Sequence, residues 1–129
     1  MKRSFVLSLV LMMTGVVFAA DHHAKDVKLE GYVVDNACAA GMFKEGGKGA
    51  EGAKTHSRAC SLMPPCAKSG YSVYADGMLY KLDEESSKKV ADVLKSSKTE
   101  KGVQVKIEGT AEGDKLTIKT VSEVEASTK

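Results

Sequence analysis

Two short β-prone runs joined by Asp76-Gly77 are the strongest local constraint on the fold of this chain. The runs are Tyr71–Ala75 and Met78–Leu82. Asp-Gly is a preferred two-residue connection between antiparallel strands, because both turn positions need backbone angles that aspartate and glycine tolerate. The pattern therefore predicts a β-hairpin over residues 71–82.

The segments on either side of the hairpin contain three further strands and one helix. Apolar and polar residues alternate over residues 27–34, which predicts a first strand. After the hairpin, Asp83 is placed to cap a helix that ends near residues 95–98, with acids in its first turn and bases in its last. Two more alternating runs, beginning at Val103 and at Leu116, predict the last two strands.

This order of elements is typical of an OB-fold. We therefore predict a mainly β (α+β) domain: an OB-like, five-stranded small barrel with one helix between strands three and four. A generic α+β sheet covered by one helix is the alternative. Residues 36–69 then form a long irregular segment between the first two strands, where OB-folds carry binding loops. Its middle, residues 44–54, is rich in Gly, Lys and Glu and is predicted to be a mobile loop.

The first 19 residues have the layout of a cleavable secretory signal peptide. Lys2-Arg3 precedes an apolar run that ends in small residues, with cleavage expected after Ala19 or after Ala20. A transmembrane anchor is the alternative, but the run is at the lower limit for a bilayer span. We expect an exported protein, periplasmic or secreted, with no membrane span after cleavage. Residues 20–26 are predicted as a disordered tail and residues 27–125 as a single domain.

The charge of the chain argues against a nucleic-acid partner. The chain has 19 Lys+Arg and 17 Asp+Glu, and Lys2 and Arg3 leave with the signal peptide, so the mature protein is close to neutral. A nucleic-acid binder is expected to keep a basic excess on one face.

No Gly-rich phosphate loop, Ser-His-Asp order or Cys-x-x-Cys pair is present. We therefore assign no catalytic residue and expect a binding module rather than an enzyme.

One histidine and three cysteines flank the Gly-rich stretch and are the strongest candidates for a site. They are Cys38, His56, Cys60 and Cys66. His56 and Cys60 are four residues apart, so one helical turn would place both side chains on the same face. Three thiolates and one imidazole form a complete tetrahedral donor set for zinc. The sequence therefore predicts a Cys/His site that holds either a soft metal ion or a structural disulfide, although the spacing matches no standard zinc-finger pattern.

Other residues extend or compete with this site. Asp35 is a candidate to orient His56 from behind the ligands or to cap the loop, and an ordinary turn aspartate is the alternative. Met42 and Met63 lie close in sequence, and their thioethers make copper(I) an alternative to zinc. A second copper(II) or nickel(II) site is possible at the mature N-terminus, where His22 or His23 stands third in the chain and supplies an imidazole beside the amine and amide nitrogens.

A structural disulfide fits the same cysteines as well as a metal ion does. Exported proteins oxidise their cysteines, and Cys60 with Cys66, or Cys38 with either, would staple the segment. One thiol would then be left over, which is unusual outside the cytoplasm unless that thiol is buried, ligating or reactive. A thiol-redox protein using Cys60, Cys66 and Cys38 is a second alternative. A structural or ligand-binding barrel with stapling cysteines only is a third.

Several of these features together resemble a group of small exported bacterial proteins of unknown function. The resemblance rests on Gly31-Tyr32-Val33-Val34-Asp35-Asn36-Ala37-Cys38, His56-x-x-x-Cys60, Cys66, Gly70-Tyr71, Asp76-Gly77 and Val103-x-Val105-x-Ile107-x-Gly109. Those proteins have a G-x-V-x-D-x-x-C opening, a His/Cys middle and an OB-like end. The resemblance covers nearly all of the mature chain. It implies an exported bacterial domain with its Cys and His residues close together, and it implies no activity.

Overall fold

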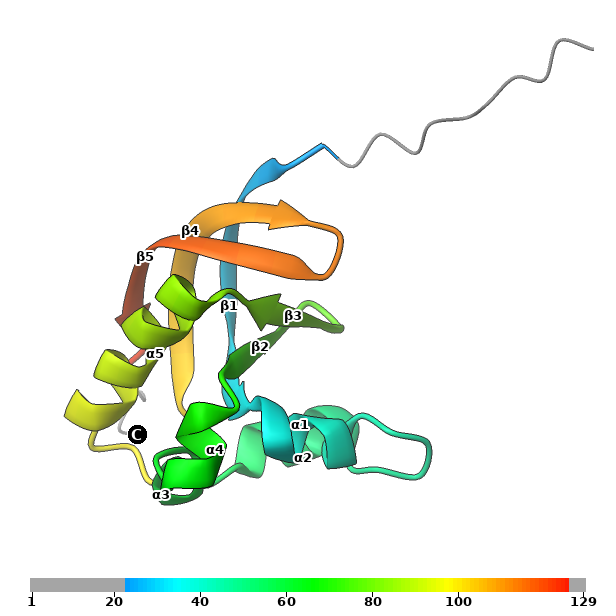
Figure 1. Cartoon of the computed structure of the whole chain (residues 1–129), viewed down its shortest axis with the longest axis vertical. Helices are drawn as coiled ribbons and strands as arrows, with labels where there is room; N and C mark the ends of the chain where they lie inside the picture. Colours follow the sequence, from blue (N-terminus) through cyan, green and yellow to red (C-terminus); the bar gives the residue numbers. More distant parts are fainter. Residues whose placement is uncertain (1–22, 126–129) are drawn as a thin grey trace, which may run out of the picture.

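The computed structural model describes residues 23–125, which form a closed five-stranded barrel with the strand order β1-β2-β3-β5-β4 (Figure 1). The predicted mainly β, OB-like barrel is confirmed. The predicted signal peptide lies outside the described residues. The strands are β1 (Lys25–Asp35), β2 (Tyr71–Ala75), β3 (Met78–Leu82), β4 (Gln104–Glu112) and β5 (Lys115–Glu123).

Strand β1 is long enough to pair with two neighbours in turn. Its first part pairs antiparallel with β4, and its last part, residues 32–35, pairs antiparallel with β2. The strand begins two residues earlier than predicted, since Lys25 pairs with Ala111 and Asp26 with Thr110. Hydrogen bonding to β4 therefore orders these two residues, which the sequence places in the tail.

The hairpin of β2 and β3 is confirmed with the predicted bounds. Asp76 and Gly77 both have positive φ angles, 49° and 78°, as the tight turn between antiparallel strands requires. Strand β3 then pairs in parallel with β5, with Leu82 opposite Leu116. This short parallel pair closes the barrel and removes the free edges that an open sheet would expose.

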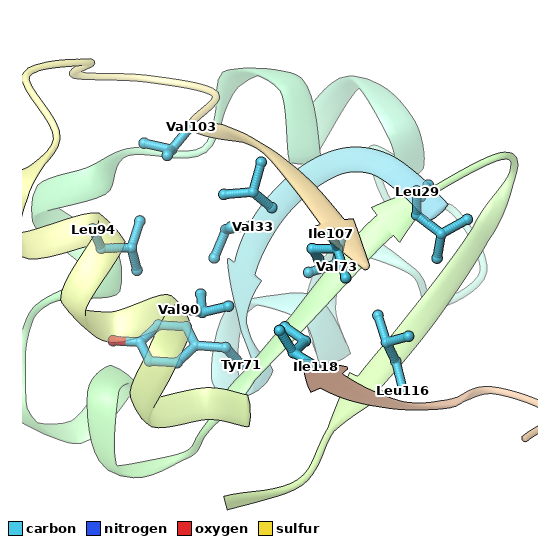
Figure 2. Packing of buried hydrophobic residues seen from close by; sticks show 12 residues of the cluster. Leu29, Val33, Tyr71, Val73, Val90, Leu94, Val103, Ile107, Leu116 and Ile118 are labelled. Carbon is cyan, nitrogen blue, oxygen red and sulfur yellow. The ribbon is translucent and has the colours of Figure 1, made fainter. Parts of the chain in front are cut away.

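Buried side chains from the strands and from the long helix α5 (Glu84–Ser96) fill the barrel (Figure 2). The buried cluster consists of Leu29, Val33, Tyr71, Val73, Ala75, Val90, Leu94, Val103, Val105, Ile107, Leu116 and Ile118. Strands β1 and β2 approach closely at Gly31, where an added Cβ would lie only 2.4 Å from the Tyr74 carbonyl oxygen. A requirement for close packing therefore explains the glycine that opens the motif before Asp35.

Helix α5 forms where the sequence predicts it, between β3 and β4. Asp83 precedes the helix, and its Oδ1 accepts a hydrogen bond from the Ser86 N–H at 2.7 Å. Val90 and Leu94, four residues apart, are both buried in the barrel core. The Ser86 hydroxyl accepts a hydrogen bond from the Ile118 N–H at 2.8 Å, which ties the helix to β5.

Removing the cap of α5 should destabilise the fold by about 1 kcal/mol, the usual cost of losing an N-cap side chain. We expect this loss for Asp83→Ala in urea unfolding near neutral pH, and a much smaller one for Asp83→Asn, because asparagine also caps helices well. The Ser86 hydrogen bond holds the pKa of Asp83 below its ordinary value of 3.8. The carboxylate's stabilising contribution is therefore present above that value and lost as the pH falls through the lowered pKa. Equal stability of the alanine and asparagine variants would contradict this role.

The segment between β1 and β2 is not the irregular loop that the sequence predicts. It contains four short helices, α1 (Asn36–Met42), α2 (Gly49–Thr55), α3 (Arg58–Ser61) and α4 (Pro64–Lys68), gathered at one end of the barrel (Figure 1). Helix α2 begins within the predicted mobile loop, residues 44–54, and ends one residue beyond it. Its Gly52 and Ala53 are buried, and a Cβ at Gly52 would lie 3.2 Å from the Met42 Cγ. The small residues there allow close packing rather than flexibility.

Candidate metal centre

The four predicted ligands lie on or beside the four short helices. Cys38 is in α1, Cys60 in α3 and Cys66 in α4, while His56 is the residue that ends α2. Strand β1 ends at Asp35, whose Oδ1 accepts a hydrogen bond from the Cys38 N–H at 2.9 Å and so begins α1. The first ligand is therefore positioned by a cap at the end of a barrel strand.

The part of the segment that holds His56 is fixed to the connection between α5 and β4. The His56 carbonyl accepts the Gly102 N–H at 2.9 Å, and the Arg58 N–H donates to the Glu100 carbonyl at 2.9 Å. The Arg58 guanidinium donates to the carbonyls of Thr99 at 3.1 Å and Leu94 at 3.3 Å. These bonds tie the beginning of α3 to a distant part of the chain.

Three of the four predicted ligands converge directly. One ligand atom each from Cys38, His56 and Cys60 lies within 4.8 Å of the other two. The Sγ atoms of Cys38 and Cys60 are 4.0 Å apart. Two sulfurs bonded to one tetrahedral zinc at about 2.3 Å lie roughly 3.8 Å apart, whereas a disulfide needs about 2.05 Å. The spacing therefore suits a shared metal ion, and all three cysteines are free thiols.

Cys66, the fourth predicted ligand, lies close to Cys38 in a second group of possible ligands. Ligand atoms of Asp35, Cys38 and Cys66 also lie within 4.8 Å of one another. Cys38 thus belongs to both groups, one with His56 and Cys60 and the other with Asp35 and Cys66. Each of the four residues therefore belongs to at least one of two groups that share Cys38.

Asp35 lies behind the ligands and is fully buried, with 0% of its surface exposed. Its Oδ2 lies 2.7 Å from His56 Nε2 and accepts a hydrogen bond from the Ser61 hydroxyl at 3.4 Å. Burial by itself would raise the pKa of Asp35, but the Cys38 N–H bond and the contact with His56 outweigh it and lower this pKa. Asp35 is therefore an anion that holds a proton on Nε2 of His56 and leaves Nδ1 to accept a metal ion.

The thiols of Cys38 and Cys66 are protonated near neutral pH when no metal is bound. Burial, followed by the negative charge of Asp35 and the neighbouring Cys60 thiol, raises the pKa of Cys38 to about 12. Burial, Asp35 and Cys60 also raise the pKa of Cys66. A redox nucleophile needs a lowered pKa, since the thiolate is the reactive form. These two thiols therefore give little support to the thiol-redox alternative.

Two buried residues that support Asp35 were not identified from the sequence. The Tyr71 hydroxyl donates to the Ser61 carbonyl at 2.8 Å, and each of these residues is 1% exposed. Ser61 in turn donates to Asp35, so a chain of hydrogen bonds connects β2, α3 and the end of β1. Nothing in the sequence marks Ser61, and the sequence predicts Tyr71 only as the first residue of a strand.

The remaining candidates lie in different surroundings. Met42 packs in a second, smaller core around Val34, Ala39 and Ala53. Met63 precedes α4 and is 52% exposed. His23 is an exposed residue before β1, and His22 lies outside the described residues, so the N-terminal copper or nickel site stays a prediction.

Comparisons with protein-family models, with curated proteins and with solved structures find no match to this chain. The interpretation of the site therefore depends on its own geometry. Within residues 23–125, no helix has both the length and the apolar character needed to cross a membrane.

Proposed function

We propose that this chain is an exported, periplasmic or secreted zinc-binding protein whose metal ion is held by Cys38, His56, Cys60 and Cys66. The observation that carries the proposal is the convergence of two donor groups on Cys38, with a sulfur–sulfur distance of 4.0 Å between Cys38 and Cys60. The signal-peptide pattern of the first 19 residues supports export. A metal ion that cross-links distant segments would add to the folding stability of such a small domain.

Charge and donor number favour zinc over copper(I). Three thiolates and the buried Asp35 carboxylate place several negative charges in a small volume, and a divalent ion offsets more of that charge than a monovalent one. An imidazole and three thiolates supply the four donors of tetrahedral zinc. Because four protein ligands fill the coordination sphere, no position is left for a substrate, and the proposed role is metal binding rather than catalysis.

Native mass spectrometry of the periplasmic protein tests the proposal directly. We expect one zinc ion per chain, an N-terminus at Ala20 or Asp21, and three thiols that react with a blocking reagent only after chelation or denaturation. A chain two daltons lighter than its sequence mass, with one reactive thiol and no metal, would instead show the disulfide staple. Retention of copper in place of zinc would support the thioether alternative.

Zinc affinity should fall as the pH is lowered. Each thiol must lose its proton to bind the ion, and the raised pKa of Cys38, about 12, means that zinc competes with a bound proton at neutral pH. We expect the apparent affinity to drop about tenfold per pH unit for each displaced proton. Competition with a chromogenic chelator between about pH 6 and about pH 8, corrected for the chelator's own protonation, measures this slope. An affinity that does not change with pH would show that thiols are not the ligands.

A further inference from the structure

A surface groove of about 440 Å³ is lined by residues of α5 on one side and by Leu62 and residues of α4 on the other. Its α5 wall is formed by Glu84, Ser87, Lys88, Ala91 and Lys95, whose spacing of three or four places them on one face of the helix. Leu62 and residues 67–71 form much of the opposite side. The volume falls within the range of small-molecule sites, roughly 300–1,000 Å³.

The floor of the groove is apolar and rests on the barrel core. Leu62, Ala67, Leu82 and Ala91 line it, and all four are partly buried side chains that pack against the main buried cluster. A side chain supported in this way has little freedom to move, so the floor is already formed before a ligand arrives. An alkyl chain or a ring that covered it would be removed from water without distorting the fold.

The rim of the groove carries a positive charge. Lys68, Lys88 and Lys95 line it, against a single acid, Glu84. Lys88 is paired with Glu84 at 2.9 Å, and Lys95 lies 3.9 Å from Asp92. Lys68 has no ion-pair partner among residues 23–125, so its charge is available to a ligand.

From this arrangement we infer that the groove binds a small amphipathic anion, such as a carboxylate on a short alkyl chain or ring. The apolar part lies on Leu62, Ala67 and Ala91, and the carboxylate lies beside Lys68. The inference does not depend on the proposed zinc ion, although α4 carries Cys66 next to Ala67 and so borders both places.

Calorimetric titration of the protein with octanoate tests the inference, with octyltrimethylammonium as a probe of similar chain length and opposite charge. We expect saturable binding of octanoate and much weaker binding of the cation. Lys68→Glu should weaken octanoate binding roughly fivefold, because reversal of one exposed charge changes the binding free energy by about 1 kcal/mol. Ala91→Trp should abolish binding by filling the groove.

Lys106→Glu is the matched control, since it makes the same charge change at an exposed residue of β4 outside the groove lining. It should leave octanoate binding unchanged. Circular dichroism verifies that each variant is folded, and if Ala91→Trp is not, the comparison of Lys68→Glu with Lys106→Glu decides. No saturable octanoate binding, equal binding of the cation, or equal weakening by the two lysine variants would overturn the inference.

Discussion

Cys60→Ser should lower the affinity for zinc roughly 100-fold, since a four-ligand zinc site binds with about 10–16 kcal/mol and one ligand contributes roughly a quarter of that. Cys60 is the best choice for this test because its thiol is 4.0 Å from Cys38 and its side chain caps no helix. Serine has nearly the same shape and is a much poorer zinc ligand. The affinity is measured by competition with a chelator.

The same change should remove much of the stability that zinc gives. Zinc at about 1,000 times its Kd stabilises a folded protein by about 4 kcal/mol, which raises the Tm of a domain of this size by roughly 20 °C. A 100-fold loss of affinity reduces this gain by about 2.7 kcal/mol at the same zinc concentration. Thermal unfolding followed by circular dichroism, with zinc and with a chelator, measures the difference.

Ala59→Ser is the matched control for Cys60→Ser. Ala59 is an exposed residue in the same turn of α3, so the substitution adds a hydroxyl beside the site without removing a thiol. It should leave both the zinc affinity and the zinc-dependent Tm shift unchanged. If Cys60→Ser behaves like Ala59→Ser, Cys60 does not ligate the metal and the proposed centre is wrong.

Asp35→Asn should weaken zinc binding by about 10- to 100-fold although Asp35 is not one of the four ligands. Asparagine can still cap α1 through its carbonyl oxygen, and this leaves its NH₂ group facing His56 Nε2. An NH₂ group donates a hydrogen bond, so Nε2 must become the acceptor and the proton moves to Nδ1. The nitrogen that would bind zinc is then blocked.

Two measurements separate this positioning role from a general loss of stability. Nitrogen NMR of His56 in the metal-free protein should show a proton on Nε2 in the original chain and on Nδ1 in the variant. The metal-free variant should also be less stable, by about 2 kcal/mol, because the buried Asp35 makes charge-assisted hydrogen bonds. The affinity is therefore compared at a temperature at which both proteins are fully folded.

Asp83→Asn is the matched control for Asp35→Asn. Asp83 also caps a helix through its carboxylate, but it lies outside the metal centre. The same chemical change there should leave zinc affinity and the His56 tautomer unaltered. If Asp35→Asn keeps its zinc affinity, or if His56 keeps its proton on Nε2, Asp35 does not select the tautomer.

The individual elements could largely be predicted because their signals are local. The turn at Asp76-Gly77, the cap at Asp83 and the alternation in β1, β4 and β5 each depend on residues close in sequence. The order of these elements was enough to predict the barrel. The sequence did not predict the helices between β1 and β2, because a Gly- and Lys-rich composition is found both in flexible linkers and in closely packed segments. Only the burial of Gly52 and Ala53 in the folded protein shows that this segment is closely packed.

What the sequence determined by itself is the set of donor residues, since three thiols and one imidazole follow from residue type alone. Only the tertiary structure decided that Cys38 lies close to His56 and Cys60 in one group and to Cys66 in another. Closure of the barrel and the bonds of Arg58 to the α5–β4 connection bring together residues up to 28 positions apart, from Cys38 to Cys66. The role of Asp35 was likewise decided in three dimensions, because burial at the end of β1 and the contacts with His56 and Ser61 involve residues more than 20 positions away. Such contacts depend on how the whole chain packs, and no local sequence pattern predicts them.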